Sequence, residues 1–139
     1  MRPRHPSPHR VVDLAAAFGL AGAVPADLAV TGVTVASGDA QPGDLFVAEP
    51  GLRVHGARYA GAAVAAGAVA VVTDAAGAAE AGATGVPVLV ADDPRALAGP
   101  LAAEVYGRPA SRLVTVGVTG TNGKTTTSYF VDAALRAAH

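Results

Sequence analysis

The sequence contains no cysteine, no tryptophan and few charged side chains. Without cysteine, the chain cannot hold a disulfide framework, a thiolate zinc site or a cysteine nucleophile, and a reducing, cytoplasmic location is expected. Charged residues make up 15%, against about 25% in typical globular proteins, and a net charge of -1 gives no field to hold a polyanion. The longest apolar stretch, Ala60 to Thr73, is shorter than the roughly 20 residues that span a bilayer. We therefore expect neither nucleic acid nor a membrane as a partner.

Isoleucine is also absent, so the core depends on other apolar residues. The chain has 34 Ala, 20 Val and 10 Leu, a composition that suits close packing of helices on a sheet. Its 139 residues allow one domain and perhaps the start of another, since about 100 to 200 residues make one domain. Residues 1–10 contain three Pro and three Arg and have no apolar period, so we predict a disordered tail.

Strand-like and helix-like segments alternate over residues 11–110. Asp93 and Pro94 form a typical helix start, whereas Gly99-Pro100 should kink or split the same helix. Alternation of this kind predicts an α/β domain with a largely parallel or mixed sheet and flanking helices. The expected helices cover 11–18, 57–66 and 94–106, and the expected strands cover 30–35, 44–48, 69–73 and 86–90.

A second pattern begins after Gly107 to Arg112, where Gly, Pro and Ser mark a boundary. Leu113 to Val118 is a nearly continuous apolar run and predicts a strand buried on both faces. From Gly123 onward, apolar residues recur at helical spacing. One strand and one helix cannot form a sheet domain, so residues 111–139 are expected to be the incomplete start of a second domain.

The loop between that strand and helix, Thr119 to Thr126, reads T-G-T-N-G-K-T-T. Gly120 and Gly123 allow the backbone to turn its N–H groups inward, and the positive end of the helix dipole favours an anion there. Lys124 is the only lysine among ten basic residues and would reach the β- and γ-phosphates of a nucleotide. The hydroxyl of Thr125 would bind Mg²⁺.

This loop departs from the strict phosphate-loop pattern at one position. The pattern G-x-x-x-x-G-K-[ST] requires Gly at position 118, where the sequence has Val118. An ordinary Gly-rich turn between a strand and a helix is the alternative interpretation.

The variant T-G-T-N-G-K-T-T resembles the ATP loop of the Mur ligases, which add amino acids during peptidoglycan synthesis, and of the related folylpolyglutamate synthetases. Three upstream segments, Val33 to Ser37, Pro42 to Ala48 and His55 to Tyr59, are similar to the UDP-binding N-terminal domain of the branch that adds the third amino acid. The resemblance covers roughly residues 25–139. It implies a UDP-binding domain followed by the first strand, P-loop and helix of a truncated central ATPase domain.

The same resemblance implies the roles of individual residues. Lys124 would be catalytic, Thr125 would also hold the magnesium ion, and the uridine nucleotide would contact two segments. Ala36 and Gly38 replace the Asp and Arg of the common D-S-R form, so Ser37 could instead be a simple turn residue. The implied ATP contacts are Gly120, Thr121, Asn122, Gly123, Lys124, Thr125 and Thr126, and the implied substrate contacts are Val35, Ser37, Leu52, Arg53 and Val54.

The activity implied is that of an ATP-dependent amide ligase that joins an amino acid to UDP-N-acetylmuramoyl-L-alanyl-D-glutamate through an acyl-phosphate. The Ala- and Arg-rich composition is similar to that of actinobacterial members, which favours meso-diaminopimelate as the amino acid. The family has its other magnesium ligands and its amino-acid-binding domain in chain that would follow, so these 139 residues are expected to be an inactive N-terminal fragment. A D-alanyl-D-alanine-adding Mur ligase and a stand-alone nucleotide-binding module are the alternatives.

Overall fold

The computed structural model describes residues 7–138. The chain divides into two compact units, Met1–Pro109 and Ala110–His139. Most of the predicted tail, residues 1–6, lies outside the described residues.

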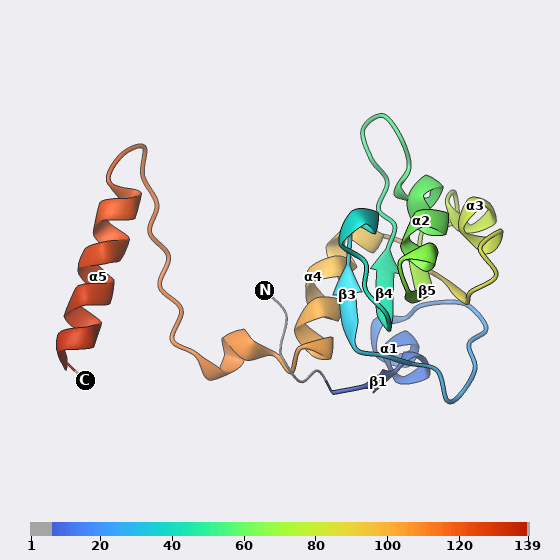
Figure 1. Ribbon diagram of the computed structural model, residues 1–139, viewed down its shortest axis with the longest axis horizontal. Helices are drawn as coiled ribbons and strands as arrows, with labels where there is room; N and C mark the ends of the chain where they lie inside the picture. Colours follow the sequence, from blue (N-terminus) through green and yellow to red (C-terminus); the bar gives the residue numbers. More distant parts are fainter. Residues whose placement is uncertain (1–6, 139) are drawn as a thin grey trace. The chain divides into compact units, whose positions relative to one another are not determined.

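The first unit is built on a parallel sheet of four strands (Figure 1). The strands lie in the order in which they occur along the chain, and every neighbouring pair is parallel. This confirms the α/β class and the parallel sheet that the sequence predicts. The strands are β3 (Gly32–Thr34), β4 (Asp44–Val47), β5 (Ala68–Thr73) and β6 (Val88–Val90), and a separate antiparallel pair is formed by β1 (His9–Arg10) and β2 (Ala29–Val30).

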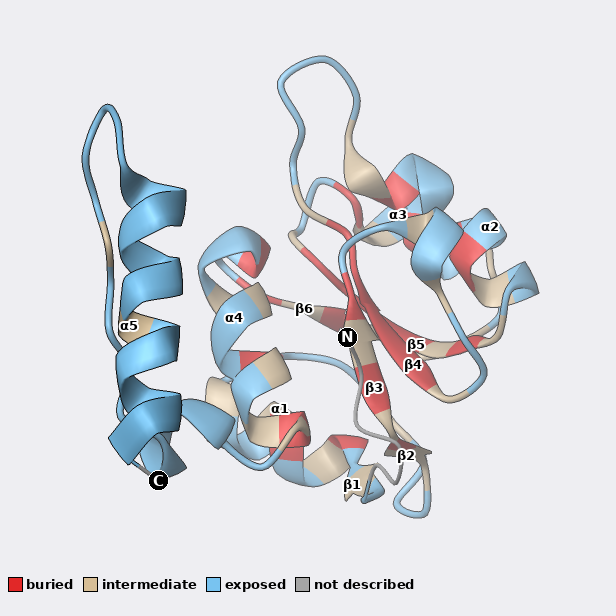
Figure 2. Ribbon diagram, turned by 60° about the vertical axis from the view of Figure 1, so that its left-hand side comes forward, coloured by how far each residue is buried: buried red, intermediate tan, exposed pale blue. Residues whose placement is uncertain are grey.

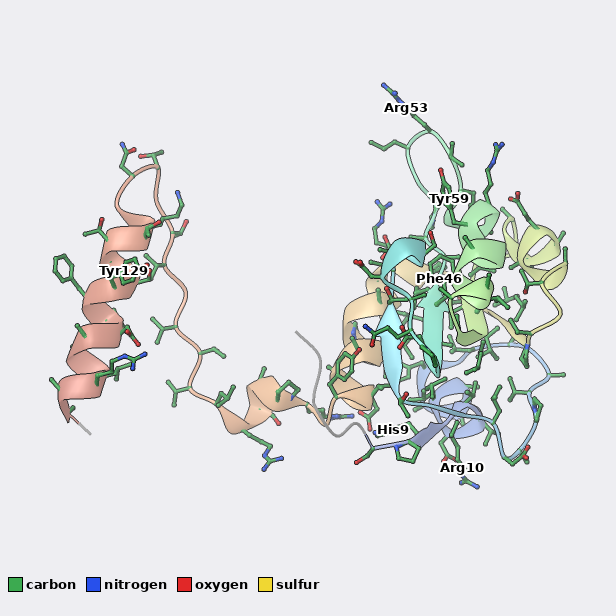
Figure 3. All side chains as sticks on the ribbon, viewed as in Figure 1. His9, Arg10, Phe46, Arg53, Tyr59 and Tyr129 are labelled. Carbon is green, nitrogen blue, oxygen red and sulfur yellow. The ribbon has the colours of Figure 1, made fainter. Side chains whose placement is uncertain are left out.

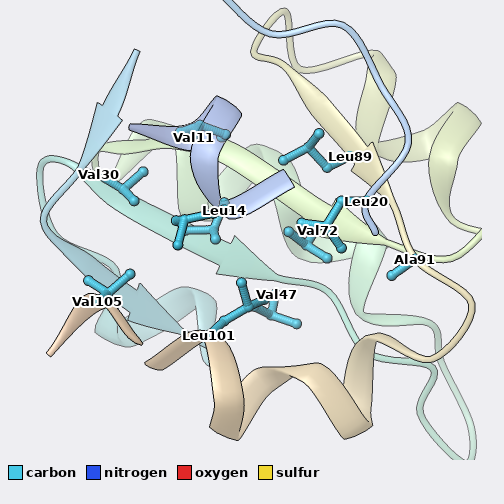
Figure 4. Packing of buried hydrophobic residues seen from close by; sticks show 12 residues of the cluster. Val11, Leu14, Leu20, Val30, Val47, Val72, Leu89, Ala91, Leu101 and Val105 are labelled. Atoms are coloured by element: carbon cyan, nitrogen blue, oxygen red, sulfur yellow. The ribbon is translucent and has the colours of Figure 1, made fainter. Parts of the chain in front are cut away.

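Helices cover both faces of this sheet. Along β4, Leu45 and Val47 pack into one cluster with residues of α1 and α4, while Phe46 packs into a second cluster with residues of α2 and α3. This alternation is the two-residue period of a strand, and it explains why β4 is buried throughout and β5 is buried at every position except Val69 (Figures 2 and 4). The helices are α1 (Val11–Phe18), α2 (Ala60–Ala65), α3 (Ala78–Gly82) and α4 (Pro94–Val105), with 3-10 turns η1 (Ser37–Asp39), η2 (Gly56–Tyr59) and η3 (Pro109–Arg112).

Local signals place the ends of two helices correctly. Gly19 ends α1 in the left-handed conformation, with φ 64°, and its N–H donates to the carbonyl of Ala15. Asp93 caps α4 through a hydrogen bond from the Ala96 N–H. The helix nevertheless runs through Pro100 as one element, so the expected split does not occur.

Two predictions near the start of the chain are wrong. His9 and Arg10 belong to a strand rather than a disordered tail, because they pair with Val30 and Ala29 across helix α1 and the loop that follows it. Residues 30–35 do not form one strand, because the chain passes from β2 to β3 at Thr31, whose N–H donates to the carbonyl of Gly43. Val35 therefore follows β3 and is exposed.

The second unit contains one helix, α5 (Lys124–Ala138), as the apolar spacing predicts. The predicted buried strand at 113–118 is wrong, because this segment has no strand assignment and Leu113, Val114 and Val116 are exposed. A strand requires ladder hydrogen bonds from a neighbour, and no described residue provides them for this segment. None of the described residues of α5 is buried (Figure 2).

Candidate functional site

The four parallel strands of the first unit end at the same edge of the sheet. In open parallel sheets, ligands bind outside the carboxyl ends of the strands, where the following loops meet. Val35 and Ser37 come directly after β3, and residues 52–54 lie in the loop after the neighbouring strand β4. The fold therefore brings the two predicted substrate-binding segments to one edge.

A pocket of about 720 Å³ lies beside the edge strand β3. Val35 contributes to its lining, whereas Ser37 does not; Ser37 starts the turn η1, and its carbonyl accepts a hydrogen bond from Ala40. The hydroxyl of Thr34 fixes the start of this turn, because it donates to the Ala36 carbonyl at 3.0 Å and accepts from the Ala36 N–H at 3.2 Å. The lining residues are Val33, Thr34, Val35, Ala36, Gly38, Asp39, Ala40, Gln41 and Tyr106.

Tyr106 is a pocket residue that the sequence analysis missed. Its hydroxyl accepts from the Val33 N–H at 3.1 Å and donates to the Val33 carbonyl at 3.3 Å. The end of α4 thus satisfies backbone groups of an edge strand, which would otherwise be open to pairing. Because the two residues are 73 positions apart, no local pattern indicates this contact.

The loop after β4 has a closed base and an exposed tip. The Gly56 N–H donates to the Glu49 carbonyl at 2.8 Å, and a Cβ at position 56 would lie 2.7 Å from that oxygen, so only glycine fits. From the start of α4, Arg95 donates to the Pro50 carbonyl at 2.6 Å and to the Glu49 carboxylate at 3.2 Å. Leu52 is fully exposed, and Arg53 points away from the body of the first unit (Figure 3).

At the base of the same loop, His55 joins the turn that follows β5. Its Nε2 lies 3.0 Å from Oδ1 of Asp74, and its Nδ1 accepts from the Ala57 N–H at 3.0 Å. The Gly77 N–H donates to the same Asp74 oxygen at 2.8 Å. This backbone hydrogen bond and the hydrogen bond from His55 hold the pKa of Asp74 below its ordinary value of 3.8, against the opposing effect of burial.

In the second unit, the loop 119–126 leads into the start of α5. Gly120 and Gly123 have φ of 152° and 77°, conformations that L side chains rarely adopt. The Gly123 carbonyl accepts from the Thr127 N–H at 2.9 Å, so the N–H groups of the first three helical residues have no partner within the helix. The Lys124 ammonium folds over the loop and donates to the Gly120 carbonyl at 2.5 Å.

Residues 29–106 match the family described as "Mur ligase family, catalytic domain", which is more than half of the chain. The chain belongs to the Mur ligase family. Membership agrees with the resemblance found in the loop and in the upstream segments. The residues predicted to contact the substrate belong to the first unit, and those predicted to contact ATP belong to the second.

Several Mur ligase relatives are similar over almost the whole chain. A protein of Streptomyces avermitilis named UDP-N-acetylmuramoyl-L-alanyl-D-glutamate--2,6-diaminopimelate ligase is 50% identical over 97% of this chain and 26% of its own length. A protein of the same name from Streptomyces coelicolor is 48% identical over 99% of the chain and 27% of its own length. A UDP-N-acetylmuramyl-tripeptide synthetase of Leifsonia xyli is 46% identical over 97% of the chain and 26% of its own length. The chain thus spans about a quarter of the length of these relatives.

Within residues 7–138, no three His, Asp or Glu side chains gather in a way that could hold a metal ion. Over the same range, no helix has the length and apolar character needed to cross a bilayer.

Proposed function

We propose that this chain carries the uridine-nucleotide-binding unit and the ATP phosphate loop of a ligase that adds meso-diaminopimelate to UDP-N-acetylmuramoyl-L-alanyl-D-glutamate. The observation that carries this proposal is the meeting of the segments after β3 and β4 at the carboxyl edge of the parallel sheet. The names of the Streptomyces relatives supply the reaction and its substrates. A cytoplasmic location belongs to the same proposal, because the reaction consumes ATP.

The first unit would bind the nucleotide end of the substrate. Val35 and Leu52 are exposed apolar side chains that can contact a base, and Arg53 can form a charge-assisted hydrogen bond with a diphosphate. The Ser37 hydroxyl can donate to a uracil or phosphate oxygen. Binding this end would orient a long substrate, since the carboxylate that reacts belongs to its D-glutamyl residue.

The second unit would bind the triphosphate of ATP, and the residues present fit that group. The first three N–H groups of α5 lack intrahelical partners, and the Lys124 ammonium already lies over the loop on a carbonyl acceptor. A phosphate oxygen would compete with the Gly120 carbonyl for that ammonium. The hydroxyl of Thr125 would hold Mg²⁺, and Asn122 and Thr126 would complete the loop's polar lining. Bound ATP supplies the phosphoryl group that activates the substrate carboxylate.

The names of the relatives differ in how they specify the amino acid added. The name of the Leifsonia relative specifies a tripeptide product but no third amino acid. The candidate residues of this chain concern the nucleotides, so binding of UDP compounds tests this part of the proposal.

The test is isothermal titration calorimetry of the 139-residue chain with UDP-N-acetylmuramoyl-L-alanyl-D-glutamate, UDP, and the corresponding UDP-tripeptide. We expect the UDP-dipeptide to bind, and Arg53→Ala to weaken its binding by about tenfold, the loss expected for a hydrogen bond to a charged group. Arg112→Ala removes an exposed arginine of η3 and serves as the matched control. Tighter binding of the tripeptide would favour the D-alanyl-D-alanine-adding ligase, and no binding of any UDP compound would refute the proposal.

A further inference from the structure

The imidazole of His55 has a defined protonation pattern. Its Nδ1 accepts a hydrogen bond from the Ala57 N–H, so this nitrogen carries no proton. In the neutral ring the proton then lies on Nε2, which donates to the Asp74 carboxylate. The ring therefore connects two backbone segments in one tautomer: the loop after β4 and the turn after β5.

The partner carboxylate is itself held in place. Oδ1 of Asp74 accepts from both His55 and the Gly77 N–H, and the His55 and Asp74 side chains are only 23% and 22% exposed. Gly77 packs closely against the ring, since a Cβ there would lie 2.5 Å from Cε1 of His55 and 2.9 Å from the Ala57 side chain. The contact between His55 and Asp74 is thus a half-buried hydrogen bond among closely packed atoms rather than an exposed ion pair.

The tip of the loop depends on such contacts at its base. Residues 51–54 are exposed, and the hydrogen bonds that hold the loop lie at Glu49, Pro50, His55 and Gly56. His55 directly follows Val54, so its ring sets the direction in which the chain leaves the tip. An exposed tip that binds a ligand must otherwise lose its conformational freedom on binding, which weakens affinity.

We propose that the His55–Asp74 pair is a clasp that positions residues 51–54 for binding of the uridine nucleotide. The clasp rests on the proposed function of this edge of the sheet. Both side chains act through the loop and are positioning residues, with no contact to the reacting atoms.

Three variants distinguish the contact between His55 and Asp74 from the hydrogen bond that His55 accepts from the Ala57 N–H. Asp74→Ala removes the partner, whereas Asp74→Asn keeps an oxygen that can accept from Nε2 and from Gly77. His55→Asn retains a side-chain acceptor for the Ala57 N–H but is too short to keep the contact with Asp74. Asp92→Ala, an exposed aspartate that follows β6 at the same edge, is the matched control.

The experiment combines amide hydrogen exchange of the ligand-free chain with calorimetric titration of UDP-N-acetylmuramoyl-L-alanyl-D-glutamate. We expect Asp74→Ala and His55→Asn to speed exchange of the Gly56 amide, whose hydrogen bond to the Glu49 carbonyl closes the base of the loop, and to weaken binding about tenfold. Asp74→Asn should restore most of the affinity, and Asp92→Ala should leave both quantities unchanged. The ¹⁵N shifts of His55 in the unmodified chain should report a proton on Nε2.

Two results would overturn the clasp: unchanged exchange of the Gly56 amide in both disruptive variants, or faster exchange that extends equally to the buried β4 amides, which indicates a general loss of stability. If the unmodified chain binds no UDP compound, the proposed function fails. The exchange of the Gly56 amide in the ligand-free chain then decides by itself whether the clasp closes the base of the loop.

Discussion

Among the single residues of this chain, Asp74 shows most directly how backbone geometry sets side-chain chemistry. The turn after β5 aims the Gly77 N–H at the carboxylate, and His55 donates to the same oxygen. Both contacts favour the ionised form, so the pKa of Asp74 lies below 3.8 in the folded chain. Folding and deprotonation of Asp74 are therefore linked.

The sign of this linkage gives a pH dependence. A carboxylate with a lowered folded pKa stabilises the fold fully above the pKa of the unfolded chain, about 3.9, and this stabilisation is lost as the pH falls through the lower, folded pKa. We expect the difference in the free energy of unfolding between the unmodified chain and Asp74→Asn to shrink below about pH 4. Urea unfolding measured between about pH 2 and pH 7 checks this.

The control for this series is Asp92→Asn, which removes an exposed carboxylate at the same edge of the sheet. Its pH profile should parallel that of the unmodified chain. A parallel profile for Asp74→Asn as well would contradict the coupling between Asp74 and the folded state.

At the scale of helices and strands, short-range sequence signals were sufficient to predict features that depend on neighbouring residues alone. Helix 11–18 with its Gly19 end and the Asp93 cap of α4 each depend on residues within one turn, and both predictions are confirmed. Pairing of residues 9–10 with 29–30 depends on residues far along the chain, and the sequence gives no sign of it. The apolar run at 113–118 is typical of a buried strand, so the sequence predicted one there. A strand also needs a neighbouring strand to pair with, and composition does not show whether one is present.

The candidate site likewise has one feature that topology predicts and others that depend on contacts between residues far apart in the sequence. Because Val35 ends one predicted strand and Leu52 follows the next, their placement at one edge could be anticipated from topology alone. The contacts that hold this edge could not be anticipated from the sequence. Tyr106 reaches Val33, and Asp74 reaches His55, only through tertiary packing. Their functional roles stay predictions until binding is measured.

Helix α3 offers a test of how tightly this edge is packed. Gly77 precedes α3, and an added Cβ there would collide with His55 and Ala57, whereas Gly82 ends α3 with open space around it. We expect Gly77→Ala to lower the free energy of unfolding by about 1 to 3 kcal/mol through overpacking. Gly82→Ala, the matched control, should be neutral or stabilising by up to about 1 kcal/mol. Equal effects of the two substitutions in thermal and urea unfolding would show that the clasp region is loosely packed.

At the scale of the whole molecule, the chain divides its two proposed nucleotide functions between two compact units. The uridine set belongs to a sheet with its own core, and the phosphate loop belongs to a unit of one helix and one extended segment. Because the two sets of residues belong to different compact units, we expect loss of one binding function to leave the other intact.

This separation predicts a specific result for Lys124→Ala. Removal of the only lysine should weaken Mg²⁺-ATP binding by more than about tenfold, since a hydrogen bond to a charged group is lost, and should leave binding of the UDP-dipeptide unchanged. Arg136→Ala removes a cation from the same helix, where Arg136 pairs with Asp132 at 2.8 Å, and serves as the control for charge alone. Paired calorimetric titrations of both nucleotides distinguish the outcomes. Unchanged ATP binding in Lys124→Ala would make the loop an ordinary Gly-rich turn, and equal weakening of both ligands would contradict the independence of the two units.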